Sequence, residues 1–175
     1  MTDLRQTISD NLSGFESLMA KIPGYKGYKE KEMRREADTL LRQHLAAQYE
    51  AQLRRATDVA SQLLTGPGMS QLTELDKGNT RLQTLIDKIK TAAQGYAGLF
   101  DAIKVKEDEL DKLYDFDNGM LTHVDSVGAA IEAIQAAVDG GDASALAPTV
   151  RGYVKAVTDA SAQFDQRRDV LTGMA

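Results

Sequence analysis

The chain has 175 residues, no cysteine, no tryptophan and a net charge of −5. This length is typical of one domain that buries a core without cross-links. The missing cysteines exclude disulfides and thiolate metal sites, and the negative charge argues against general nucleic-acid binding. No stretch approaches the roughly 18 consecutive apolar residues of a membrane span, and the first residues lack the apolar core of a signal peptide. We therefore expect a single cytoplasmic domain over residues 1–175, with a position peripheral to the inner face of the membrane as the alternative.

Composition favours helix throughout the chain. Only three prolines occur, and strong helix formers such as Ala, Leu, Gln, Glu, Lys and Arg are abundant. Alternating β-branched runs bounded by turns are missing, so no strands are predicted. We expect an all-α fold, an elongated and mainly antiparallel helical bundle of five or six helices. The expected helices cover residues 3–21, 28–64, 69–115, 118–139 and 143–171.

The first expected helix ends at the strongest interruption in the chain. Its apolar stripe follows helical spacing and consists of Leu4, Ile8, Leu12, Phe15 and either Leu18 or Met19. Residues 21–31, which we call the elbow, then bring Pro23, Gly24 and Gly27 together. Proline cannot donate a backbone hydrogen bond and glycine allows positive φ, so a helix should stop here. Six basic and two acidic residues fall between Lys21 and Arg35, which leaves the rest of the chain at −9.

Two long helices are expected next, with a turn at Thr65-Gly66-Pro67-Gly68 between them. The third expected helix has the most regular pattern, with apolar steps of four and three at Leu82, Ile86, Ile89, Ala93, Tyr96, Phe100 and Ile103. Such steps are typical of a coiled-coil-like seam against an antiparallel partner. Gly95 and Gly98 interrupt the pattern, and we interpret them as a close approach of another helix, with a bend as the alternative. A ligand pocket lined by Gly95, Tyr96, Gly98 and Phe100 is a further hypothesis.

The boundary between the third and fourth expected helices is open. Asp115-Phe-Asp-Asn-Gly119 carries helix-capping residues and a glycine stop signal. A new apolar stripe begins at Met120, offset by one residue from the old one. The segment is either a turn or a kink near Asp117 in one long helix.

No catalytic or metal-binding pattern is present. His44 and His123 do not follow a glutamate by three residues, as a di-metal carboxylate bundle requires. The segment after Asp115 fails the calcium-loop spacing, because position 12 is Ser126. Nucleophilic catalysis needs a nucleophile beside an oriented base, and no such motif appears. We expect no enzymatic activity, no cofactor and no metal.

The elbow is the remaining candidate site. Gly24-Tyr-Lys-Gly27 matches a nucleic-acid-binding GXXG loop, but the sheet of that fold is not predicted, and the phosphate-binding lysine motif is absent as well. Exposed backbone N–H groups and lysines could still hold an anion. The alternative is a purely structural role, in which the tyrosines pack over the end of the helices while the lysines stay solvated. The candidate contact residues are Tyr25, Lys26, Tyr28, Lys29, Lys31 and Arg34.

Two stretches resemble a group of small bacterial all-helical proteins to which no activity can be attached. They are Ile22-Pro-Gly-Tyr-Lys-Gly-Tyr-Lys-Glu-Lys31 and Tyr96-Ala-Gly-Leu-Phe-Asp-Ala-Ile-Lys-Val-Lys-Glu-Asp-Glu-Leu-Asp-Lys-Leu-Tyr-Asp-Phe-Asp117. The resemblance implies a bacterial, cytosolic origin and transfers no functional residue.

Three function hypotheses follow from these patterns. The first is a non-enzymatic scaffold or adaptor that binds another protein or a second copy of itself. The second is a peripheral membrane protein whose elbow contacts anionic lipid, and the third is a small-molecule-binding bundle.

Overall fold

The computed structural model describes residues 13–175, and every regular element in that part of the chain is a helix. The all-α prediction is therefore confirmed for these residues. The six α-helices are α2 (Gly14–Lys21), α3 (Arg34–Leu63), α4 (Leu72–Thr91), α5 (Ala93–Ala102), α6 (Glu107–Asp139) and α7 (Ala143–Gly173). Two 3-10 helices, Lys31–Met33 and Pro67–Gln71, precede α3 and α4. Among the described helices, none is both long enough and apolar enough to cross a membrane.

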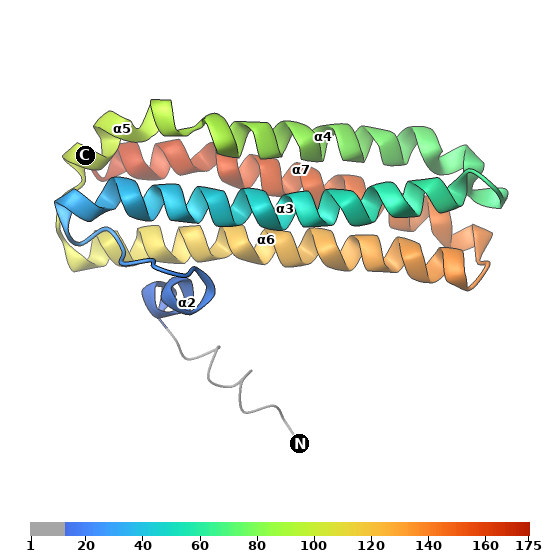
Figure 1. Cartoon of the computed structure of the whole chain (residues 1–175), viewed down its shortest axis with the longest axis horizontal. Helices are drawn as coiled ribbons and strands as arrows, with labels where there is room; N and C mark the ends of the chain where they lie inside the picture. The colour runs from blue at the N-terminus through green and yellow to red at the C-terminus, as the bar shows by residue number, and fades with distance from the viewer. Residues whose placement is uncertain (1–12) are drawn as a thin grey trace, which may run out of the picture.

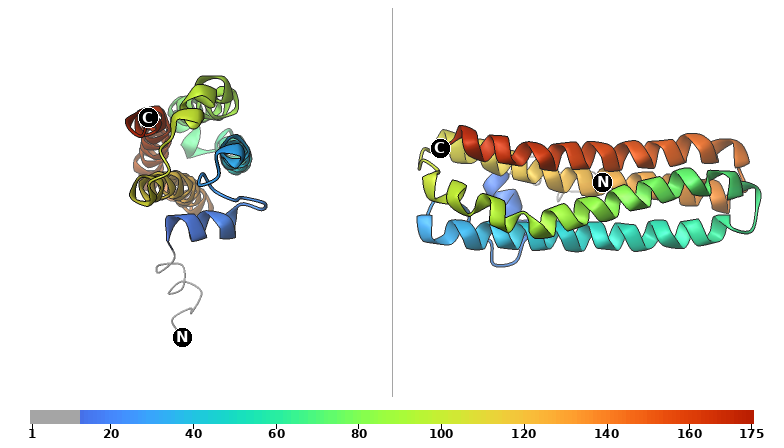
Figure 2. Two further views of the ribbon diagram at one scale, coloured as in Figure 1. Left: turned by 90° about the vertical axis from the view of Figure 1, so that its left-hand side faces the viewer. Right: turned by 90° about the horizontal axis from the view of Figure 1, so that it is seen from above.

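Helices α3, α4, α6 and α7 lie side by side, and consecutive ones run in opposite directions (Figures 1 and 2). Helix α5 continues α4 toward the same end, and the short α2 lies across the outside of α6. One end of the molecule, the elbow end, holds the elbow, the loop 103–106 and the C-terminus. The opposite, distal end holds the turns at 64–71 and 140–142.

The apolar stripes meet in one core. The seam residues Leu82, Ile86, Ile89, Tyr96, Phe100 and Ile103 are buried to 6 % exposure or less. Ala93 is exposed because the helix breaks at Ala92, between the end of α4 and the start of α5. On α2, Leu18 is buried while Met19 is exposed, so Leu18 continues the first stripe. The expected stripe positions Leu4, Ile8 and Leu12 lie outside the described residues.

The expected helix over 69–115 is wrong at two places. It breaks at Ala92, and the loop 103–106 separates α5 from α6. Ile103 has an extended backbone (φ −58°, ψ 124°) and buries its side chain, which ends α5. Glu107, Asp108 and Glu109 form the first turn of α6, where negative charge is stabilised by the positive end of the helix dipole.

Helix α6 then runs without interruption through residues 115–119. The open question about this segment is thus answered in favour of one long helix. The helix boundary expected near Asp117 is wrong, since α6 is continuous from Glu107 to Asp139 and Asp117 lies on its buried face.

The close approach expected at Gly95 and Gly98 is also wrong. A Cβ atom built on either glycine meets no atom within 4 Å outside its own helical surroundings, and both residues are exposed. Their place on the solvent side of α5 explains why the apolar pattern continues past them. Each glycine lowers helix stability by roughly 1 kcal/mol relative to alanine. That cost is consistent with α5 being short and following a break in the helix.

Candidate functional site

The elbow is a sharply folded backbone that needs its two glycines. Helix α2 ends at Lys21, as predicted, and Gly24 and Gly27 have φ of 79° and 80°. At Gly27 a Cβ would lie 2.6 Å from the Tyr114 hydroxyl and 2.7 Å from the Phe15 ring. Any side chain at this position would therefore collide with the aromatic residues beneath it.

The structure places the elbow tyrosines in the interior. Tyr28 is fully buried, and its ring stacks between Phe100 and Tyr114 with centroids 5.6 Å away on each side. Its backbone N–H donates to the Tyr114 hydroxyl at 2.8 Å. Tyr25 is buried with its ring edge toward Tyr28. Both candidate residues are thus committed to internal contacts.

Arg34, a third candidate contact residue, is also buried. Its two hydrogen bonds within residues 13–175 both go to backbone carbonyls. Its Nε donates to the carbonyl of Tyr28 at 2.8 Å, and its Nη1 donates to the carbonyl of Phe100 at 3.1 Å. The Phe100 carbonyl lies in the last turn of α5, where unpaired carbonyls carry partial negative charge. Arg34 therefore joins the elbow to the end of α5 and lowers the cost of its own burial.

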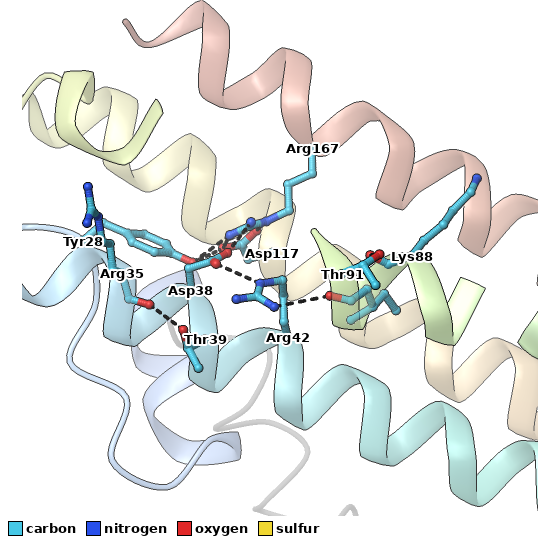
Figure 3. A network of polar contacts seen from close by, with 10 residues as sticks. Tyr28, Arg35, Asp38, Thr39, Arg42, Lys88, Thr91, Asp117 and Arg167 are labelled. Atoms are coloured by element: carbon cyan, nitrogen blue, oxygen red, sulfur yellow. Dashed lines mark hydrogen bonds and ion pairs between the residues drawn. The ribbon is translucent and has the colours of Figure 1, made fainter. Parts of the chain in front are cut away.

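A buried ion-pair network lies beneath the elbow (Figure 3). Arg167 of α7 donates from Nε to Asp117 Oδ1 at 2.9 Å and from Nη1 to Asp38 Oδ1 at 2.6 Å. Its Nη2 donates to the Tyr28 hydroxyl at 2.9 Å, and that hydroxyl donates to Asp117 Oδ2 at 2.7 Å. The network thus connects the elbow with α3, α6 and α7.

Arg42 completes the charge balance. Its Nε donates to Asp38 Oδ2 at 2.8 Å, one helical turn away on α3. Two arginines, Arg42 and Arg167, then face two carboxylates, Asp38 and Asp117, with all four side chains buried. The rings of Tyr96 and Phe100 lie 5.3 and 5.7 Å from the Arg167 guanidinium carbon, within cation–π range. A buried charge is costly unless it is paired and hydrogen-bonded, and this arrangement meets both conditions.

The environment shifts the pKa of several groups in the network. Burial raises the pKa of the Asp117 carboxyl, and the Arg167 guanidinium opposes that shift. Burial, followed by the charge of Asp117, raises the pKa of the Tyr28 hydroxyl well above its usual value. Burial alone would lower the pKa of Arg167, but its anionic neighbours, Asp117 first, raise it. Tyr28 therefore stays a neutral donor and Arg167 stays charged at ordinary pH.

The network itself has no open position for a substrate. Its donors and acceptors already bond to one another, and Tyr96 and Phe100 contact the Arg167 guanidinium where a ligand pocket was the hypothesis. Phe100 additionally stacks on Tyr28. The arrangement supports a structural role, because its bonds hold the elbow against the helices.

The surface of the elbow is different. Lys26, Lys29 and Lys31 are exposed, and Lys29 Nζ lies 3.7 Å from Glu107 Oε1 of α6. A surface groove of about 380 Å³ lies where the elbow and the start of α2 meet α6. Its lining residues are Ser13, Phe15, Lys26, Lys29, Glu30, Glu107, Leu110, Asp111 and Tyr114. Two lysines and three carboxylates therefore line the groove together with aromatic and apolar side chains.

A second polar surface lies farther along the molecule. His44, Lys21, Gln48 and Asp125 line a shallow hollow of about 260 Å³, where burial, followed by the charge of Lys21, lowers the pKa of His44. Within residues 13–175, no group of three or more His, Asp or Glu side chains could hold a metal ion.

Sequence reasoning missed the central residues of the network. A signal was present, because each of them stands where an apolar residue is expected. Arg167 lies three residues after Phe164 and four before Leu171 in the stripe of α7, and Asp117 lies three residues from both Tyr114 and Met120. A charged residue at an interior stripe position predicts a buried ionic partner on another helix.

No model of a known protein family matches the chain, and neither a curated protein nor a solved structure matches it.

Proposed function

We propose that this protein is a non-enzymatic helical scaffold or adaptor that binds a partner protein in the groove at its elbow. The proposal treats the four long helices as an elongated, mainly antiparallel bundle with a coiled-coil-like seam along α4 and α5. In this view the buried network has a mechanical role. It holds the elbow in one geometry, so that the partner meets a preorganised surface and binding requires little ordering of the chain.

The observation that carries the proposal is the mixed charge of the groove. Lys26 and Lys29 stand among Glu30, Glu107 and Asp111, and Phe15, Leu110 and Tyr114 supply apolar contact area. Protein interfaces combine aromatic anchors with a polar rim in this manner. The surface offers complementary positions to a peptide segment that carries both charges and an apolar side chain.

The same observation argues against the membrane alternative. An anionic lipid surface attracts clusters of lysine and arginine, each worth about 1 kcal/mol near the surface. Here three carboxylates share the groove with two lysines, and Lys29 is partly neutralised by Glu107. The two tyrosines that could have entered the lipid interface are buried in the core.

The experiment compares charge-reversal variants in the native cell. Lys26→Glu/Lys29→Glu changes the groove, while the control Lys77→Glu/Lys155→Glu changes two exposed lysines on α4 and α7. Cross-linking from the elbow followed by mass spectrometry should recover a protein partner with wild type and with the control. Recovery with the groove variant should fall about tenfold, as expected for the loss of roughly 1.4 kcal/mol.

Equal recovery with the groove variant would contradict the proposal. A second arm tests the membrane alternative by co-sedimentation with phosphatidylcholine vesicles, with and without phosphatidylserine, at low and high salt. We expect the protein to stay in the supernatant. Sedimentation that requires phosphatidylserine and disappears with Lys26→Glu/Lys29→Glu would favour the membrane reading instead.

A further inference from the structure

The distal end carries an apolar cavity between its two turns. The cavity measures about 120 Å³, the volume of roughly four liquid water molecules at about 30 Å³ each. Its lining residues are Gln62, Leu63, Thr65, Gly66, Pro67, Gly68, Ala137, Val138, Gly141, Ala143 and Leu146. The amides of Gln62 and Gln135 exchange two hydrogen bonds, at 3.0 and 3.1 Å, and so tie α3 to α6 at the base of this end. A site of this size accommodates one small aliphatic side chain.

Exposed apolar side chains stand beside this cavity. Leu64 and Met69 are 58 % and 64 % exposed, and they flank the same turn that lines it. Clustered exposed apolar residues on a folded protein mark an interaction surface more often than isolated ones do. The distal end thus provides a cavity with an apolar rim.

Charge restricts what this end can bind. The stretches 56–76 and 132–150 contain six carboxylates and no lysine or arginine. Two of the six, Glu74 and Glu132, pair with Lys77 and Arg55 just outside these stretches, which leaves four carboxylates at this end. Asp139 and Asp142 are sequence neighbours of lining residues, since Asp139 follows Val138 at the end of α6 and Asp142 lies between Gly141 and Ala143 at the start of α7. Anionic lipid and nucleic acid would be repelled, and so would a second distal end. The occupant should therefore be an apolar side chain that is flanked by cations.

The elbow end of the same chain presents such a segment. In the loop 103–106, Ile103 is buried and anchors the backbone, while Val105 is 58 % exposed between Lys104 and Lys106. This loop and the turns that line the distal cavity lie at opposite ends of the long axis (Figure 1). Lys104 and Lys106 are the charges directly beside Val105 in the sequence, and beyond them Glu107 Oε1 lies 3.7 Å from Lys29 Nζ.

We propose that copies of this protein associate head to tail, with Val105 of one copy inserted into the distal cavity of the next. Lys104 and Lys106 then face the carboxylates of Asp139 and Asp142. Because the two contacting surfaces differ, the contact is heterologous and extends into a linear array along the long axis. The partner of the proposed scaffold would then be a second copy of the chain. The biological purpose of the contact rests on the proposed function, whereas the contact itself does not.

The contact should be weak. A single side chain and two loop lysines cover far less than the roughly 1,200 Å² of a standard stable interface. Association should therefore appear only at high protein concentration, and it should weaken at high salt because exposed charges are screened. Both features are measurable by sedimentation velocity over a concentration series.

Two variants each block one side of the contact. Val105→Asp places a negative charge in the loop, and Ala143→Leu fills the mouth of the cavity from an exposed position at the start of α7. The matched controls are Met19→Asp, another exposed apolar residue, and Ala133→Leu, an exposed alanine on α6 that does not line the cavity. Circular dichroism of each variant checks that the helices are intact.

We expect wild type and both controls to associate, and each blocking variant to require at least about tenfold higher concentration. An equimolar mixture of Val105→Asp and Ala143→Leu retains one intact loop and one intact cavity. This mixture should form pairs and nothing larger, because each copy can use only one end. Such complementation is the specific mark of a heterologous contact.

Two results would overturn the inference. One is a wild type that stays monomeric at every concentration, and the other is association that survives both blocking variants. Neither result bears on the elbow groove, because the blocking positions do not line it. Conversely, failure of the groove variants to change partner recovery would leave the head-to-tail contact standing.

Discussion

Arg167 is the residue on which the geometry of the elbow end depends most. It is fully buried and bonds to Asp117, Asp38 and Tyr28, which belong to three different segments of the chain. The desolvation penalty of such a group is several kcal/mol, and only well-placed partners offset it. Removing one partner leaves the other charge buried and unpaired. The free energy of unfolding therefore falls by more than the intact pair contributes to it.

We predict that Arg167→Met lowers the free energy of unfolding by about 3–5 kcal/mol, the range for breaking a buried ion pair. The substitution leaves Asp117 and Asp38 in the interior without their shared cation. Chemical denaturation of purified protein, followed by circular dichroism, measures the change. The neighbouring Arg168→Met is the control, because Arg168 is exposed and surface substitutions usually stay within about 0.5 kcal/mol.

The double variant Arg167→Met/Asp117→Asn separates charge from packing. It removes one of the orphaned carboxylates while keeping an amide oxygen that can accept from the Tyr28 hydroxyl. We expect it to be more stable than Arg167→Met alone. If the single and double variants were equally destabilised, lost packing and not uncompensated charge would be the cause.

For single residues, the sequence predicted which positions are buried better than it predicted which side chains bond to one another. Within the described residues, every position of the seam from Leu82 to Ile103 except Ala93 lies in the core, and the lysines of the elbow are solvated. The ionic network could not be predicted, because Asp38, Asp117 and Arg167 are far apart in the chain. Each was noticeable as a charged residue on an apolar face, but the choice of partner depends on how α3, α6 and α7 pack.

At the scale of elements, the helical periodicity was correct on both sides of the breaks and did not reveal the breaks themselves. Helix α5 continues the direction of α4 (Figure 1), so the seam spacing from Leu82 to Phe100 survives the interruption at Ala92. The acidic run Glu107-Asp-Glu109 marks the start of α6, a signal that the single helix expected over 69–115 did not take into account. Asp115 to Gly119 has capping residues but remains helical, and Asp117 bonds to Arg167 of α7 instead of capping a helix end.

The elbow shows the opposite case, in which local signals were sufficient. Pro23, Gly24 and Gly27 predicted the end of a helix, and α2 ends at Lys21. The start of the next helix was expected at residue 28 but lies at Arg34, after a short 3-10 helix. The delay follows from tertiary contacts, because Tyr28 leaves the surface to stack between Phe100 and Tyr114.

At the scale of the whole molecule, all six tyrosines report on the integrity of the core. Each has a raised pKa, and burial is the first cause in every case. A folded-state pKa above the unfolded value of 10.0 means that the folded protein resists ionisation. The stability that this protection represents is complete below about pH 10 and is lost as the pH rises further.

We therefore predict that tyrosinate absorbance appears together with the loss of helical circular dichroism in an alkaline titration. The tyrosines ionise once the core opens, and their ionisation in turn favours the unfolded state. Tyrosine side chains in an unfolded chain titrate near pH 10. The same protein in denaturant is therefore the matching control. Tyrosinate formation well before any loss of helix would show that the rings are accessible.

We infer that the contacts beneath the elbow fix it to the interior, so that its lysines form one rigid surface. Native-state hydrogen exchange of the Tyr28 amide tests this claim most directly, because that N–H is buried and donates to the Tyr114 hydroxyl. We expect the Tyr28 amide to exchange as slowly as amides in the middle of α3, and we expect Arg167→Met to speed its exchange more than that of amides at the distal end. Exchange at the rate of an exposed loop in the wild-type protein would contradict the account.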